Sequence, residues 1–429
     1  MLKYIQIIFT GILTSFYLFP FDFTFLPGIS GKLIMAVIGL SLFGIDLARH
    51  GHRYFRTDLL IVTLFALGVS LTSVFAVIFN ETQQYGDYAI FFISMWVWLS
   101  AGYCLLFIIN KIHGETSIEL VGKYLIAVCV AQCLIAYLNE QVPAVHSIVN
   151  TINPDPFTEE IKRWRGIGAS LDTAGIRFSA VLVIMAHLII RERSTQKNLP
   201  MLYAISFFII CFLGNIISRT TIVGMLIALC YLVVATFINR DKQNTSLNRF
   251  WNYFLWSALI FVPLITWIYT TNPEMREFIR HGFEGFFSLV EKGHWEVSSN
   301  EILKDMIVFP EDTKTWIIGE GYLIDPTGIE PYYTGPDWHG WYRDTDIGYL
   351  RFLFFSGICG IIAIASYIIA AGRMCIHRYP SHAVLFKILV LLNFICWLKV
   401  STDIFLIFAI FLCLPHAEVD AEDRTAISS

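Results

Sequence analysis

The sequence predicts an all-α membrane protein, a polytopic bundle of about twelve transmembrane helices that forms a single domain over residues 1–429. Hydrophobic residues make up 56% of the chain and charged residues only 15%, and the mean hydropathy is +0.62. Soluble domains contain about 45–50% apolar and about 25% charged residues. The composition therefore excludes an ordinary soluble enzyme, a disordered protein and a nucleic-acid-binding protein.

Long apolar runs recur along the whole chain. A helix that spans a bilayer needs about 20 mostly apolar residues. By this criterion we expect spans at residues 4–20, 28–47, 59–79, 89–109, 120–139, 174–190, 200–217, 220–238, 250–269, 346–371, 383–399 and 402–415. Only Ser218 and Arg219 separate the seventh span from the eighth, so this pair is expected to form a tight hairpin.

The distribution of Lys and Arg predicts the orientation of these spans, because basic residues collect in short cytoplasmic loops. With a cytoplasmic N-terminus, Arg49, Arg191, Arg249 and Arg373 fall in inner loops, while the outer loops after the first and third spans contain no basic residue. This orientation places both termini in the cytoplasm. It places the 140–173 loop and the 270–345 segment outside.

The long outer segment 270–345 is inserted between the ninth and tenth spans. It contains 14 acidic and six basic residues, a net charge of −8. Asn272 and Pro273 are typical of a helix start, and Ser298 with Glu301 three residues later matches a capping box. We therefore expect two short amphipathic helices in this loop, followed by an irregular segment from about residue 309 to 345.

The irregular segment is rich in aromatic residues, including Trp316, Tyr322, Trp338, Trp341 and Tyr342. Aromatic faces pack on the C–H surfaces of sugars, and the neighbouring carboxylates can accept hydrogen bonds from hydroxyl groups. These residues are candidate glycan-binding residues. The alternative is the aromatic belt that membrane proteins place at the lipid–water interface.

Four arginines are predicted to lie at the outer ends of helices, at similar depth: Arg165, Arg177, Arg219 and Arg351. A single arginine there can extend to lipid phosphates. Four at one level, against the positive-inside bias, favour a shared anionic ligand. Because the guanidinium group donates two parallel hydrogen bonds to phosphate, we expect them to bind a diphosphate carried by a lipid.

Candidate acid–base residues also lie on the outer side. His339 follows Trp338, and Asp344 and Asp346 lie at the start of the tenth span; each could take a proton from a sugar hydroxyl. Asp344 and Asp346 match the DxD pattern, a pair that can hold a metal ion on a nucleotide-sugar diphosphate. A three-residue pattern matches easily by chance, and this one is predicted to lie outside, away from the cytoplasmic nucleotide sugars. With no other metal or nucleotide motif, we expect no metal, no cofactor and a lipid-linked donor.

Three stretches resemble the O-antigen polymerase and O-antigen ligase superfamily of bacterial inner membranes. The first is 165–174, which enters a span, and the second is the Ser-Arg-Thr turn within 217–221. The third combines 319–322 with 344–350 and 355–360, similar to the conserved end of the family's long outer loop. The resemblance covers about residues 160–365.

The resemblance implies an inverting, metal-independent glycosyltransferase of the inner membrane with a periplasmic long loop. Its substrate would be an undecaprenyl-diphosphate-linked oligosaccharide, and a chain-length regulator is a candidate protein partner. Ligases of the family carry a His before the span that follows the long loop, where this chain has Asp344 and Asp346. This difference favours a polymerase of O-antigen or capsule repeat units. The alternatives are a ligase that transfers glycan to lipid A core and a non-catalytic flippase or exporter.

Overall fold

The protein is nearly all-α in a computed structural model that describes residues 2–24, 26–50, 57–86, 88–161, 163–192, 198–238, 245–325 and 341–414. About 79% of the described residues are helical. The described β-structure comprises one small antiparallel pair, β1 (Asp22–Phe23) and β2 (Leu26–Ser30), together with a single bridge between Ile324 and Trp341.

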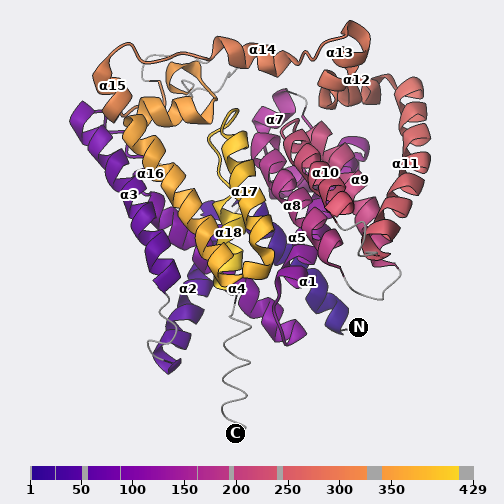
Figure 1. The fold of residues 1–429 in the computed structure, drawn as a ribbon, viewed down its shortest axis with the longest axis horizontal. Helices are drawn as coiled ribbons and strands as arrows, with labels where there is room; N and C mark the ends of the chain where they lie inside the picture. Colours follow the sequence, from indigo (N-terminus) through magenta and orange to yellow (C-terminus); the bar gives the residue numbers. More distant parts are fainter. Residues whose placement is uncertain are drawn as a thin grey trace.

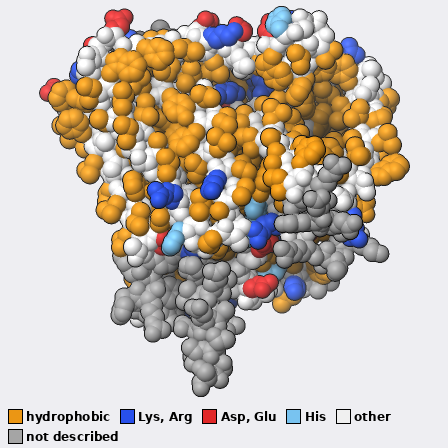
Figure 2. Space-filling model, viewed as in Figure 1, with side chains coloured by type: hydrophobic (Ala, Val, Ile, Leu, Met, Phe, Trp, Pro, Cys, Tyr) orange, Lys and Arg blue, Asp and Glu red, His pale blue; other side chains and the backbone are white. Residues whose placement is uncertain are grey.

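Within the described residues, nine helices are long and apolar enough to cross a membrane. They are α2 (Gly31–His50), α3 (Thr57–Asn80), α4 (Phe91–His113), α5 (Ile118–Gln141), α8 (Leu171–Arg191), α9 (Leu199–Ile217), α10 (Thr221–Ile238), α11 (Thr245–Thr271) and α16 (Gly348–Arg378). The architecture is that of a multi-pass membrane helix bundle. Figure 2 shows apolar side chains covering the flank of this bundle.

The other three predicted spans coincide with shorter helices, α1 (Leu2–Leu18), α17 (Ala383–Cys396) and α18 (Phe405–Cys413). The sequence predicts a very short connection between the last two spans, but residues 397–404 are largely non-helical. The nine residues of α18 reach only about 14 Å. Its residues Phe405–Leu412 are all buried, so α18 packs inside the bundle instead of facing lipid.

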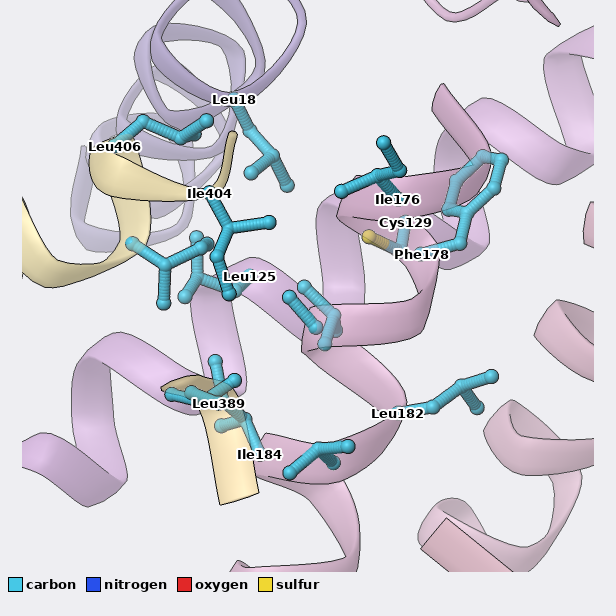
Figure 3. Close-up of a cluster of buried hydrophobic side chains, with 14 of the residues drawn as sticks. Leu18, Leu125, Cys129, Ile176, Phe178, Leu182, Ile184, Leu389, Ile404 and Leu406 are labelled. Carbon is cyan, nitrogen blue, oxygen red and sulfur yellow. The ribbon is translucent and has the colours of Figure 1, made fainter. Parts of the chain in front are cut away.

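Helix α8 lies at the centre of the bundle, and every residue from Ala174 to Ile189 is buried. It packs against α5, α9, α10 and α17. Figure 3 shows side chains of α8 (Ile176, Phe178) facing those of α1, α5, α17 and the start of α18. A helix that is apolar and buried on all sides is typical of the interior of a large bundle.

Helices α12 to α15 of the long segment lie across one end of the bundle, and α1 begins at the opposite end (Figure 1). The first predicted amphipathic helix is two helices, α12 (Pro273–Gly282) and α13 (Glu284–Lys292), and Asn272 caps α12 as expected. The second is α14 (Ser298–Asp305). The predicted irregular part contains α15 (Thr313–Ile318), capped by Asp312, and the 3₁₀ helix η3 (Tyr342–Asp344). The same end carries α6 (Pro143–Ile152) and α7 (Pro156–Glu160), and η4 (Pro380–His382) precedes α17.

The tenth predicted span is broken near its start. Helix α16 loses helical geometry at Ser356 and Gly357, and Gly357 has φ +65°. The carbonyl groups freed by this break accept hydrogen bonds from the 319–321 loop, Glu320 N to Phe354 O (2.6 Å) and Gly321 N to Phe355 O (3.0 Å). The glycine-containing 319–322 motif thus has a structural role in stabilising the break, which Figure 1 shows as a change of direction in α16.

Replacing Gly357 by Ala should destabilise the protein by at least about 2 kcal/mol. A side chain is strained at this φ, and the added Cβ would lie 2.2 Å from the carbonyl oxygen of Ile317. Thermal unfolding of the purified protein measures the effect. Gly68→Ala in α3 is the matched control, since no atom would lie within 4 Å of the added methyl group and the stability should be unchanged or slightly higher.

Candidate functional site

A cavity of about 240 Å³ opens at the end of the bundle that carries α12–α15. Three cations line it, Arg163, Arg219 and Lys399, together with the two carboxylates Asp172 and Asp346. The remaining lining is mostly apolar and comprises Leu171, Ile217, Ser218, Ser299, Ile302, Leu303, Met306 and Val400. The cavity therefore combines a basic wall with an apolar one.

Asp172, in the first turn of α8, organises the basic wall. Its Oδ1 accepts hydrogen bonds from Ser218 Oγ (3.0 Å), from Thr220 Oγ1 and from Lys399 Nζ (3.0 Å). Lys399 Nζ also donates to Thr220 Oγ1 at 3.0 Å. One carboxylate thus joins α8, the α9–α10 turn and the 397–404 segment, three parts of the chain that are distant in sequence.

The α9–α10 turn is as tight as the sequence predicts. Helix α9 ends at Ile217 and α10 begins at Thr221, and Thr221 N donates to Ser218 O at 3.0 Å. The turn comes close to α8 because Gly175 has no side chain there; a Cβ would lie 2.5 Å from Ser218 Oγ. Leu171, just before Asp172, has φ +49°, a strained conformation for a bulky residue and one that often occurs at functional sites.

Arg219 projects from this turn toward the outer helices. Its Nη1 contacts Glu284 Oε2 of α13 and lies 3.2 Å from Ser298 Oγ at the start of α14. Burial lowers the pKa of Arg219, although Glu284 and Asp172 oppose the shift, and burial together with the charge of Arg219 lowers the pKa of Arg163. A bound anion would stabilise the charged forms of both guanidinium groups.

Asp346 is the candidate base that the structure brings to the cavity. Burial raises its pKa, with Asp172 adding to the shift and Arg351 and Lys399 opposing it. Asp344 is exposed, has φ +49° and is not among the lining residues. The two carboxylates therefore face different surroundings, and no group of three or more His, Cys, Asp or Glu side chains that could hold a metal ion occurs among the described residues. His339 lies outside the described residues.

The structure separates the four arginines that the sequence grouped. Arg219 lines the cavity, and Arg165, Arg177 and Arg351 do not. Arg165 is buried, and its guanidinium group donates to Asn153 O (2.7 Å), Asn150 Oδ1 and Glu159 Oε1 (3.0 Å). These contacts give Arg165 a structural role in joining α6 and α7 to the 163–170 segment.

Arg177 and Arg351 lie beside aromatic rings. Arg177 is 7% exposed inside α8, with its guanidinium carbon 5.9 Å from the ring centre of Phe19. The guanidinium carbon of Arg351 lies 3.4 Å from the ring centre of Trp341. Arg351 acts on the cavity through its charge, which favours the ionised form of Asp346.

The candidate glycan-binding aromatics are partly engaged with one another. Tyr322 and Tyr342 are stacked with ring centres 5.0 Å apart, and Trp316 stacks on Phe309 at 6.1 Å. Trp341 is covered on one face by Arg351. Trp338 lies outside the described residues. These rings offer edges and single faces to a ligand, not a continuous stacking platform.

Sequence reasoning assigned no role to Arg163 or Lys399, and it placed Asp172 and His281 of α12 only among the outer-side acid–base candidates. His281 Nε2 is buried with no hydrogen-bond partner among the described residues. Burial, followed by the charges of Arg163, Arg219 and Lys399, lowers the pKa of His281 to about 3. The signals available in the sequence were a basic residue two positions before Arg165 and an outer-loop histidine. Neither signal indicates which side chains come together at the cavity.

Comparison with protein families, with curated protein sequences and with solved structures gave no match. The functional interpretation therefore depends on the chemistry of the cavity.

The low pKa of His281 should make stability fall as the medium becomes acidic. Below its ordinary pKa of 6.5 the unfolded chain binds a proton that the folded protein excludes until about pH 3. We expect a loss of about 1 kcal/mol between pH 6.5 and 5, a value reduced for partial exposure of the ring. Thermal unfolding at both pH values measures it, and His281→Gln should lose less stability than the wild type over this interval.

Proposed function

We propose that this protein is a glycosyltransferase that polymerises undecaprenyl-diphosphate-linked oligosaccharide repeat units into surface polysaccharide. The observation that carries the proposal is the cavity in which Arg163, Arg219 and Lys399 converge beside a carboxylate and an apolar wall. A binding site for a lipid-linked diphosphate requires both cations and an apolar surface. The cations suit its phosphates, and the apolar residues of α14 suit its prenyl chain.

We further propose that the cavity faces the periplasm of a bacterial inner membrane and that both termini are cytoplasmic. The basic loops of the sequence support this orientation. The short helices α17 and α18 would then make the last two of twelve crossings, shielded from lipid by the rest of the bundle. Residues 397–404 connect α17 to α18, and Lys399 and Val400 of this connection line the cavity.

In the proposed reaction the acceptor hydroxyl attacks the anomeric carbon opposite the diphosphate. The bond from that carbon to the diphosphate oxygen breaks, and the diphosphate leaves with the electron pair. Asp346 takes the hydroxyl proton, and the three cations stabilise the charge that develops on the leaving group. The reaction requires no metal or nucleotide and inverts the anomeric configuration.

The cavity weighs against a flippase or exporter, which would place its charges near the bilayer midplane. The ligase alternative shares the same donor chemistry and differs in the acceptor. Incubating the purified protein with a lipid-diphosphate repeat unit separates these functions. A ladder of products supports the polymerase, transfer only to lipid A core supports the ligase, and no transfer would contradict both.

Arg219→Ala should reduce transfer by about 30- to 1,000-fold, the usual effect of removing one group that stabilises transition-state charge. Lys399→Ala should cause a loss of similar order, because its charge reaches the same cavity. The measurement is the initial rate of transfer with the purified variant. Arg280→Ala is the matched control: Arg280 also pairs with a glutamate, Glu291, but on the exposed side of α12. Full activity of Arg219→Ala would contradict the assignment.

The pH dependence of transfer should report Asp346. A base works only when ionised, and the raised pKa of Asp346 places the acid limb of the rate profile above the range of an ordinary aspartate. Asp346→Asn should remove this limb together with most of the activity. Asp344→Asn should leave the profile as it is, since Asp344 is exposed and outside the cavity. The reverse result would assign the base to Asp344.

A further inference from the structure

Helix α14 extends over the cavity without being packed into the protein. Ser299, Ile302 and Leu303 of α14, and Met306 directly after it, line the cavity. No residue of α14 is buried. Ile302 is 47% exposed and the following Ile307 is 52% exposed. In Figure 1 the helix bridges the distance between α13 and α15 at the end of the bundle. An element with so little buried surface is held in place by few interactions.

One polar contact fastens the start of α14. Ser298 Oγ donates to Glu284 Oε2 at 2.9 Å and accepts from Arg219 Nη1 at 3.2 Å. Arg219 Nη1 also donates to Glu284 Oε2. The sequence predicts that Ser298 caps α14, but its hydroxyl is used in this contact, and the N-cap position is Val297 with no side-chain cap. We refer to the contact among Arg219, Glu284 and Ser298 as the latch.

Arg219 therefore belongs to both the latch and the cavity lining. Its partner Glu284 presents a carboxylate, which a guanidinium group binds in the same planar geometry as a phosphate. The side chains of Arg219 and Glu284 are 14% and 32% exposed. Because water reaches both groups, the pair can separate without leaving a buried charge unpaired.

We propose that Glu284 occupies on Arg219 the place that an anionic ligand group takes, and that exchange of the carboxylate for the ligand opens the latch and releases α14 from the cavity. Helix α14 then covers part of the cavity when it is empty and leaves the cavity open to a glycan chain when the anion is bound. The identification of the anion as a lipid-linked diphosphate rests on the proposed function, whereas the latch itself depends only on the contacts among the three side chains.

Removing the carboxylate charge of Glu284 tests this exchange. Glu284→Gln should bind undecaprenyl diphosphate about fivefold more tightly than the wild type, because the ligand no longer competes with a partly exposed ion pair. Glu291→Gln is the matched control on the same helix, since the Arg280–Glu291 pair is exposed and outside the cavity. Its affinity should equal that of the wild type.

Hydrogen–deuterium exchange of the full-length protein in lipid nanodiscs measures the release of α14. Without ligand, Glu284→Gln should exchange the amides of residues 298–306 faster than the wild type and Glu291→Gln. Undecaprenyl diphosphate should accelerate the same amides in the wild type and add little in Glu284→Gln. Unchanged thermal unfolding of Glu284→Gln shows that the effect is local.

Two results would overturn the latch: equal exchange of residues 298–306 in ligand-free Glu284→Gln and wild type, or ligand-induced protection of these amides in the wild type. Inorganic pyrophosphate, used as a lipid-free probe, separates the latch from the proposed function. If pyrophosphate accelerates exchange in the wild type and undecaprenyl diphosphate does not bind, the latch stands and the lipid-linked substrate is wrong.

Discussion

The end of the bundle that carries the cavity depends on one carboxylate. Asp172 accepts hydrogen bonds from Ser218, Thr220 and Lys399 and so joins α8, the α9–α10 turn and the segment between α17 and α18. Without it, Lys399 would lose its carboxylate partner in a cavity that Arg163 and Arg219 also line. Asp172 thereby lets cations from distant parts of the chain gather at one place while leaving their other hydrogen-bonding positions available.

A break in α16 is the second feature that forms this end of the bundle. A continuous helix from Gly348 to Arg378 would satisfy its own backbone, but the break at Gly357 exposes carbonyl groups that the 319–321 loop then binds. Unpaired backbone groups are costly near lipid, so loop and break require each other. These hydrogen bonds anchor the 319–321 loop to α16, whereas no residue of α14 is buried.

The charges around the cavity are matched incompletely, and this imbalance is what suggests a ligand. Burial disfavours the charged forms of Arg163 and Arg219, and repulsion from Arg219 adds to the effect at Arg163. Burial, followed by the charges of these cations, keeps His281 neutral. An anion bound there would stabilise the charged forms of both arginines. Three cations and two carboxylates line the cavity, and Glu284 of α13 supplies the remaining negative charge when no ligand is bound.

The sequence by itself determined the all-α membrane class, the positions of the apolar helices, the tight turn at Arg219 and the cap at Asn272, because these depend on composition and on contacts within a few residues. Only the tertiary structure decided which charges meet. The four arginines share a predicted depth, yet the guanidinium group of Arg165 is hydrogen-bonded to nearby residues such as Glu159. Lys399 lies in no distinctive sequence pattern, yet its ammonium group reaches Asp172 at the cavity. Depth along a helix follows from counting residues, whereas the direction of a side chain around the axis, and hence its partners, depends on how helices from distant parts of the chain pack.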